Sequence, residues 1–224
     1  MPNDSREKIL RRIREALAVN APPRHLSAAG ADGHPAKEWL PPVPPSGSEL
    51  LALFERNSEA LHTEVRRCTD PAMVRSELAA LARENGWAAV GAHRFALGDA
   101  AISGLGLPVV LTDEAYETSA LERCDAGVSG CSCLIAQTGG ILVTSASAGG
   151  RALSVLPPHH VVIASIDQLV GDLSDAFALL KAADGSVPAF ASFITGPSRT
   201  GDIERILVLG AHGPKRLTVL LLEG

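Results

Sequence analysis

The chain has 224 residues, of which 46% are hydrophobic and 20% charged. These values are typical of a soluble globular protein, either one large α/β domain or two small ones, with a substantial core. Aromatic residues make up only 4% and the net charge is −5, which argues against nucleic-acid binding. Because no apolar run approaches about 20 residues and the N-terminus lacks the apolar core of a signal peptide, we expect no membrane span and a cytoplasmic location.

The first 48 residues are predicted to lie outside the folded body. Residues 4–19 are predicted to form a short helix, because Ile9, Ile13 and Leu17 recur on one face. This helix is either a solvated surface element or, as we favour, a docking helix for a partner protein. Residues 20–48 hold seven of the fifteen prolines and are predicted to be an extended linker. The third predicted segment, residues 49–224, is an α/β domain.

Within this domain, apolar runs alternate with helical patterns. Helices are predicted over residues 48–67, 71–86, 113–123 and 167–181. Strands are predicted over residues 87–90, 108–112, 131–136, 141–145, 161–165, 189–194 and 217–222. Residues 203–209 fit either a short helix or a strand, and we favour the helix. Alternating strands and helices predict a parallel or mixed sheet that is covered on both faces.

The segment Phe193–Leu222 contains two polar turns that are unusual for a core. The first turn combines glycines with hydroxyl groups and one arginine, in the order Thr195, Gly196, Ser198, Arg199, Thr200 and Gly201. The second turn contains His212 between two glycines. Glycine lets the backbone approach a ligand closely, and hydroxyl and guanidinium groups donate hydrogen bonds to anions. The pattern indicates an anion-binding loop, although two plain tight turns between strands are an open alternative.

Two further polar loops are expected to join this segment, because ligands bind beyond the carboxyl ends of parallel strands. One is Gln137–Gly140, which includes Thr138 and Gly139, and the other is Ser145–Arg151. Arg151 and Arg199 are the leading candidates for binding a carboxylate or phosphate. His159, His160 and His212 offer a general base or a metal ligand, although a structural role is favoured for each.

Redox and metal chemistry have little support in the sequence. Cys68, Cys124, Cys131 and Cys133 are predicted to be reduced, buried thiols. Cys131 and Cys133 would share one face of a strand, but no second close pair completes a zinc site and the cysteine runs of iron–sulfur proteins are missing. Signatures of nucleotide-binding loops and hydrolases are also missing. We therefore predict no bound metal or cofactor.

Several motifs resemble those of the LUD (lactate utilisation) domain family. They are QTGGILVTS, RALSVLPPHH, ITGPSRTGDIE and GAHGP, and the resemblance covers roughly residues 50–224. It implies a three-layer, mostly parallel α/β fold of the NagB/RpiA/CoA-transferase-like group. It also implies a role in oxidising L-lactate to pyruvate together with two partner proteins that carry iron–sulfur clusters. In the family the strand before the Thr-Gly turn commonly ends in an acidic residue, whereas this chain has Gln137, which cannot form an acyl intermediate.

Three functions remain open at this point. The first is a non-redox subunit that binds lactate, pyruvate or a larger anion. The second is a stand-alone sugar-phosphate isomerase or acyl-CoA transferase, whose carboxylate would be Asp202 or Glu204. The third is an assembly module that docks through residues 4–19. The predicted ligand-binding residues are Thr138, Gly139, Arg151, Thr195, Gly196, Ser198, Arg199, Thr200 and His212.

Overall fold

The computed structural model describes residues 3–18, 42–44, 47–180, 187–200, 208–210 and 212–224. The chain divides after Pro41 into two units. In the first, helix α1 spans Asn3–Ala18, close to the predicted helix. Its Ile9 and Ile13 side chains are 58% and 48% exposed. Among the described residues, no helix is both long and apolar enough to cross a membrane.

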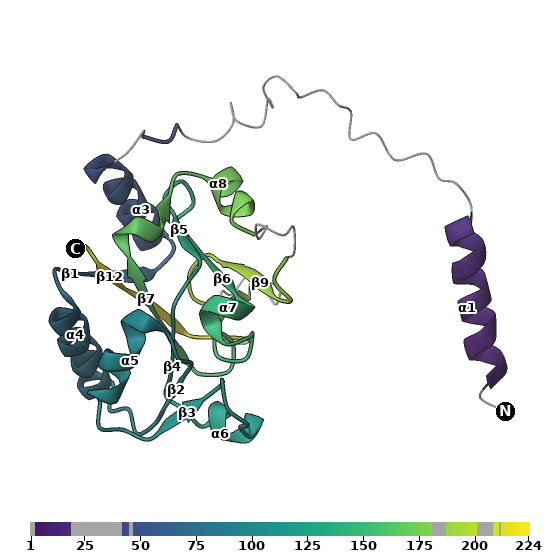
Figure 1. Cartoon of the computed structure of the whole chain (residues 1–224), viewed down its shortest axis with the longest axis horizontal. Helices are drawn as coiled ribbons and strands as arrows, with labels where there is room; N and C mark the ends of the chain where they lie inside the picture. Colours follow the sequence, from purple (N-terminus) through teal and green to yellow (C-terminus); the bar gives the residue numbers. More distant parts are fainter. Residues whose placement is uncertain (1–2, 19–41, 45–46, 181–186, 201–207, 211) are drawn as a thin grey trace. The chain divides into compact units, whose positions relative to one another are not determined.

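The second unit is built on a six-stranded sheet with the order β1-β12-β7-β4-β2-β3, whose strands all run parallel (Figure 1). The strands span, in that order, Thr63–Cys68, Arg216–Leu222, His159–Ser165, Ala126–Ser129, Val90–Ala92 and Val109–Leu111. The two central strands β12 and β7 are buried over almost their whole length, as expected for strands covered on both faces. The predicted α/β fold with a mostly parallel sheet is confirmed.

Helices α4 and α5 cover one face of this sheet. They span Pro71–Glu84 and Ala96–Ser103. Helix α4 begins as the sequence predicts, because the Asp70 side chain accepts a hydrogen bond from the backbone N–H of Met73 and Pro71 takes the first helical position. Its Leu78 and Leu81 side chains are fully buried in the core on this face.

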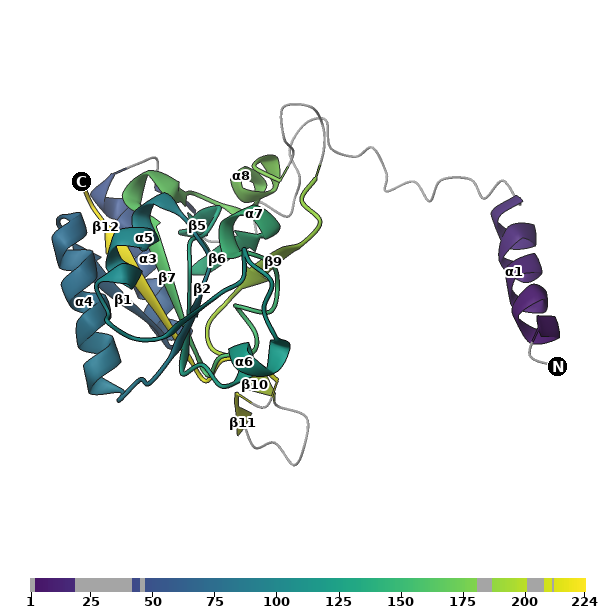
Figure 2. The same cartoon turned by 60° about the horizontal axis from the view of Figure 1, so that its bottom comes forward.

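The opposite face is shared by helix α3, Ser48–Ala60, and a second sheet (Figure 2). This sheet has the order β8-β5-β6-β9. Its strands span Leu169–Val170, Cys133–Ile135, Gly140–Thr144 and Ala191–Ile194. Strand β6 runs antiparallel to both β5 and β9. Helix α8, Leu173–Ala178, packs against the sheet through Ala176. The sequence did not predict that part of the second covering layer is a sheet.

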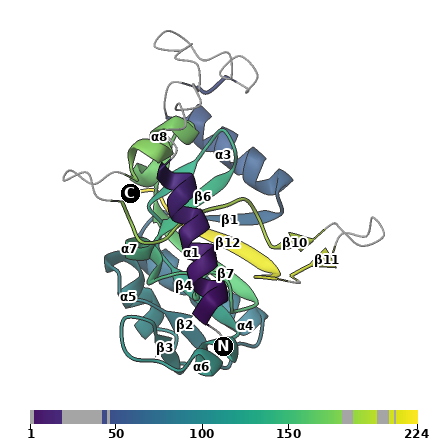
Figure 3. The same ribbon diagram turned by 90° about the vertical axis from the view of Figure 1, so that its right-hand side faces the viewer.

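Smaller elements complete the unit. Helix α6 spans Thr118–Glu122, helix α7 spans Ser145–Ala148, and a 3-10 helix spans Ile166–Gln168. Strands β10, Arg199–Thr200, and β11, Val208–Leu209, pair antiparallel. Figure 3 shows this pair projecting from the body of the domain near the start of β12.

Several predicted elements have different bounds in the structure. The helix predicted over residues 48–67 ends at Ala60, and residues 63–68 form the edge strand β1. The chain turns at His62, whose φ of 63° lies in the left-handed region, and β-branched Thr63 and Val65 favour the extended chain that follows. The predicted strand 87–90 is replaced by β2, which begins at Val90.

Helical predictions in the middle of the chain were too long. The helix predicted over 113–123 is reduced to α6, and the one over 167–181 is interrupted by β8 before α8 begins. The sequence did not predict β4, α5 or α7. Of the segment 203–209, residues 203–207 lie outside the described part of the chain, and Val208 and Leu209 form a strand rather than the favoured helix.

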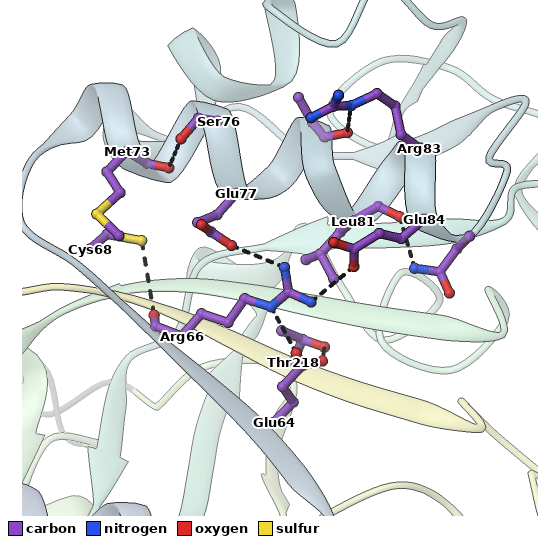
Figure 4. Close-up of polar contacts among 12 residues, drawn as sticks. Glu64, Arg66, Cys68, Met73, Ser76, Glu77, Leu81, Arg83, Glu84 and Thr218 are labelled. Atoms are coloured by element: carbon purple, nitrogen blue, oxygen red, sulfur yellow. Dashed lines mark hydrogen bonds and ion pairs between the residues drawn. The ribbon is translucent and has the colours of Figure 1, made fainter.

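A charged network ties the edge strand β1 to helix α4 (Figure 4). The Arg66 guanidinium lies 2.7 Å from Glu64, 2.9 Å from Glu77 and 3.1 Å from Glu84. The Thr218 hydroxyl of β12 donates to Glu64 at 3.2 Å. Because Arg66 is only 21% exposed, these bonds compensate a partly desolvated cation and fix α4 over β1 and β12.

Candidate functional site

A cavity of about 410 Å³ lies where β9 meets the beginnings of β7 and β12. Its described lining comes from the loop before β7, from β9 and the loop after it, and from the turn before β12. These residues are Ser154, Val155, His160, Ser192, Phe193, Ile194, Thr195, Gly196, Pro197, Ser198, Arg199, His212, Gly213, Pro214 and Leu217. Five of the nine ligand-binding residues predicted from the sequence therefore line one cavity.

Backbone hydrogen bonds hold the two polar turns of this cavity together. The N–H of Ser198 donates to the carbonyl of Pro214, and the N–H of Gly210 donates to the carbonyl of Ser198, both at 2.8 Å. Gly196 has a φ of 94°, and a Cβ at this position would lie 2.4 Å from the carbonyl oxygen of Leu61. The loop can therefore pass the end of α3 only with glycine at residue 196.

Arg199 supplies the positive charge of the cavity. Its Nη2 donates to the carbonyl of Thr195 at 3.0 Å, which folds the guanidinium back over the loop. This bond engages one of the five N–H donors of the group. No carboxylate is found among the described lining residues, so the local charge favours an anionic ligand, with the hydroxyls of Ser198 and Thr195 nearby.

His160 lies beneath the cavity and is only 1% exposed. Its Nε2 lies 2.8 Å from the Ser129 hydroxyl, which donates to the carbonyl of Gly130 at 2.9 Å. Burial, together with the neighbouring His159, lowers the pKa of His160 to about 3. The ring is therefore neutral at physiological pH and contributes no charge to the cavity.

His159 points to the other face of the sheet, as expected for adjacent residues of a strand. Its Nε2 lies 2.9 Å from the Thr218 hydroxyl, and its ring packs edge-on against Trp87 at 5.3 Å. Burial, and then the charge of Arg216, lower its pKa to about 4. The structural role favoured by the sequence fits both buried histidines, whereas His212 is exposed at the cavity.

The cavity is not where the parallel sheet was expected to place it. His160 and Leu217 are the second residues of β7 and β12, so the cavity lies at the amino ends of these strands and not beyond their carboxyl ends. The expectation was wrong because the site follows the antiparallel strand β9 of the second sheet. A sequence cannot reveal that this strand ends over the beginnings of β7 and β12.

The Gln137–Gly140 turn packs on α3 and, through Gly140, lies against Ile194 and Thr195. It joins β5 to β6, and Asn57 Nδ2 of α3 donates to the carbonyls of Ala136 and Gln137 at 2.8 and 2.9 Å. The Thr138 hydroxyl accepts a hydrogen bond from the N–H of Gly140 at 3.3 Å. Gly139 packs directly against the backbone of α3. Neither Thr138 nor Gly139 is among the described residues that line the cavity.

Arg151 is also not among the described lining residues, and the side chain of Thr200 lies outside the described part of the structure. Arg151 is an exposed residue of the loop after α7. Its carbonyl accepts a hydrogen bond from the Ser154 hydroxyl at 3.1 Å, so it supports a lining residue through its backbone only. Sequence reasoning missed Val155, Phe193 and Leu217, because apolar residues in apolar runs carry no signal that separates a cavity wall from the core.

The cysteines are buried, as predicted. Cys131 precedes β5 and packs in the core under α3, whereas Cys133 packs on the side of α8. The prediction that they share a strand face was therefore wrong. Burial raises the pKa of Cys133 to about 11 and that of Cys131 further, so both are protonated at neutral pH. No metal-binding cluster of His, Cys, Asp or Glu occurs among the described residues.

Two other cavities have less suitable linings for an anion. One of about 670 Å³ contains Asp175 and Glu223, and its Arg67 is paired with Glu223. The other, of about 460 Å³, lies beyond the carboxyl ends of β2 and β3 and is lined largely by apolar side chains with His93, Arg94 and Asp99. Their carboxylates oppose an anionic ligand, so the cavity at Arg199 is the better candidate despite its smaller volume.

A family model for the LUD domain matches residues 51–222, and the chain therefore belongs to the LUD domain family. An uncharacterised protein of Neisseria meningitidis serogroup B is 28% identical, over 96% of this chain and 92% of its own. Lactate utilization protein C of Deinococcus radiodurans is 32% identical, over 52% of this chain and 55% of its own. Further relatives share that name.

A similar fold occurs in the crystal structure of a DUF162 family protein from Deinococcus radiodurans. The TM-score is 0.61 at 21% sequence identity, and the match covers 81% of this chain and 100% of the other. At this identity the similarity concerns the fold alone.

The structural role of Gly139 can be tested by replacing it with alanine. Gly139 has a φ of 63°, and a Cβ would lie 2.5–2.8 Å from backbone atoms of Asn57 and Ser58. Gly106 has a φ of 64° with nothing within 4 Å, so Gly106→Ala is a matched control for backbone strain alone. We expect Gly139→Ala to lower the free energy of unfolding by about 1–3 kcal/mol more than Gly106→Ala, measured in urea. Equal losses would contradict the packing of this turn on α3.

The neutral state of His160 predicts a specific pH dependence of stability. Unfolded histidine has a pKa of about 6.5, whereas that of folded His160 is about 3. Between these values the unfolded chain binds a proton that the folded chain does not, so stability falls as the pH falls, by up to about 1.4 kcal/mol per pH unit. We expect the free energy of unfolding, measured in urea, to fall less between pH 6.5 and 4.5 in the His160→Gln variant than in the unchanged protein. Parallel declines would show that His160 is not held neutral.

Proposed function

We propose that this protein takes part in lactate utilisation by binding a carboxylate anion in the cavity at Arg199. One observation carries the proposal. The two polar turns line the same cavity, Arg199 supplies its guanidinium group, and none of the described lining residues has a carboxylate. The relatives named lactate utilization protein C support the metabolic context. The resemblance of the sequence to the family suggests the more specific reaction, which is oxidation of L-lactate to pyruvate.

Binding suits this cavity better than covalent catalysis. A guanidinium group matches a carboxylate with two parallel hydrogen bonds, and Ser198 lines the same cavity. Proton transfer or acyl transfer would require a carboxylate or a basic histidine. The described wall offers no carboxylate, and His160 is a poor base because its pKa is about 3. His212 is the one other described candidate for a base in the wall.

The alternative of a stand-alone isomerase or acyl-CoA transferase has less support. Its candidate carboxylates, Asp202 and Glu204, lie outside the described residues, and Gln137 occupies the position where the family commonly has an acid. Gln137 lies in the turn packed on α3 and is not among the described residues that line the cavity. Membership of the NagB/RpiA/CoA-transferase-like group remains a prediction from the family resemblance.

We propose further that the redox chemistry belongs to iron–sulfur partner proteins. The four cysteines of this chain are buried and do not have the spacing of cluster ligands. Helix α1 is the proposed docking element, because Ile9 and Ile13 are exposed on one of its faces. The division into an N-terminal helix, a proline-rich linker and an α/β domain fits this role.

The proposed anion site predicts different effects for the two arginines that the sequence singled out. Arg199→Gln removes the charge from the cavity, and hydrogen bonds to charged groups contribute about 1.5–3 kcal/mol. We therefore expect at least tenfold weaker binding of L-lactate, measured by isothermal titration. Arg151→Gln removes an exposed arginine outside the described cavity lining and should leave the affinity unchanged.

Two results would count against the site. If Arg199→Gln binds L-lactate as tightly as the unchanged protein, the guanidinium does not hold the carboxylate. If Arg151→Gln causes the greater loss, the anion binds at the loop after α7, as one part of the sequence prediction allowed.

A further inference from the structure

The cavity at Arg199 is much larger than a lactate ion. Its volume is about 410 Å³, within the range of roughly 300–1,000 Å³ for small-molecule sites. A water molecule occupies about 30 Å³ of liquid. Lactate has about six non-hydrogen atoms, so even at a full water volume for each it would occupy no more than about 180 Å³. More than half of the cavity would remain unfilled by the anion.

The part of the wall that lactate would not need is apolar. Its apolar side chains are those of Ile194 from β9, Leu217 from the start of β12, and Val155 from the loop before β7. Val155 is 42% exposed, which is high for a large hydrophobic residue. When a ligand covers apolar side chains, binding becomes more favourable by about 25 cal/mol for each Å² of apolar surface removed from water. This wall therefore favours a ligand that has an apolar body.

The alternation of side chains along β9 decides which of its residues a ligand meets. Ile194 packs with Leu217 in the core between the two sheets. The ring of the preceding residue, Phe193, lies on the other side of the second sheet and packs against Phe177 of α8, with ring centroids 5.0 Å apart. The apolar side chains on the cavity side are therefore those of Val155, Ile194 and Leu217.

The charged and apolar groups come from different parts of the chain. Ser198 and His212 belong to the two turns and Arg199 begins β10, whereas Ile194 and Leu217 belong to β9 and β12, which run into the domain. The lining thus combines polar residues from the turns with apolar residues from the strands. A ligand that contacts both sets of residues favourably has an anionic end and an apolar end.

We infer that the ligand of this cavity is a carboxylate larger than lactate that carries an apolar substituent, with the carboxylate at Arg199 and the substituent against Val155 and Ile194. This inference rests on the proposed function, because the position of the carboxylate is taken from it. It deepens that function by assigning the substrate class: a substituted 2-hydroxy acid or a related carboxylate fits the cavity better than lactate itself.

Two acids with the same head group test the inference. 3-Phenyl-L-lactate differs from L-lactate by one phenyl group on the methyl carbon, so any difference in affinity reports the apolar wall. We expect isothermal titration to give at least tenfold tighter binding of 3-phenyl-L-lactate to the full-length protein.

Matched surface variants locate the phenyl group. Val155→Ser changes an exposed residue of the cavity wall. It is expected to weaken the binding of 3-phenyl-L-lactate at least threefold and to leave the affinity for L-lactate unchanged. Val187→Ser is the control, because Val187 is 68% exposed and is not among the described lining residues. It should change neither affinity, and thermal melting of both variants checks that they remain folded.

The outcomes separate this inference from the proposed function. If L-lactate binds as tightly as 3-phenyl-L-lactate and both depend on Arg199, the larger ligand is ruled out and the anion site survives. If 3-phenyl-L-lactate binds more tightly but Val155→Ser has no effect, the phenyl group lies elsewhere and the inference is overturned. If neither acid binds, or Arg199→Gln changes neither affinity, the proposed function fails and this inference fails with it.

Discussion

The insertion of β12 between β1 and β7 is the constraint on which the rest of this domain depends. It pairs Leu217 with His160 on one side and with Thr63 on the other. The pairing places the turn before β12 against the loop after β9, where the N–H of Ser198 donates to the carbonyl of Pro214. A strand from the end of the chain thus completes both the centre of the sheet and the wall of the cavity.

The alternation of side chains along β7 and β12 then separates two polar environments. On one face, His159 and Thr218 continue into the charged network of Glu64 and Arg66, which holds α4 on the sheet. On the other face, His160 bonds to Ser129 beneath the cavity. Burial lowers the pKa of both histidines. The positive charge at the cavity therefore comes from the exposed guanidinium of Arg199 at the start of β10.

The sequence was most informative where local chemistry determines structure. Asp70 followed by Pro71 fixed the start of α4, and the continuous apolar runs of β7 and β12 indicated buried strands. The glycine and hydroxyl pattern around Arg199 identified the loop that lines the cavity. The family resemblance was carried by the same motifs and is confirmed by the match over residues 51–222.

Features that depend on distant contacts could not be predicted. The edge strand β1 contains Glu64, Arg66 and Arg67 and does not read as a strand until its pairing with β12 is known. The second sheet and the position of the cavity depend on strand order, which no local pattern encodes. The packing of Thr138 and Gly139 on α3 could not be predicted either, because a turn packed on a helix and a turn around a ligand use the same small residues.

Hydrogen–deuterium exchange with and without saturating L-lactate tests the central claim most directly, because it locates the anion without changing the protein. We predict slower exchange of backbone amides in residues 192–199 and 212–217, including the N–H of Ser198 that bonds to Pro214. Residues 93–103, beside the cavity beyond β2 and β3, should be unaffected. Protection of residues 93–103 without protection of residues 192–199 would contradict the account.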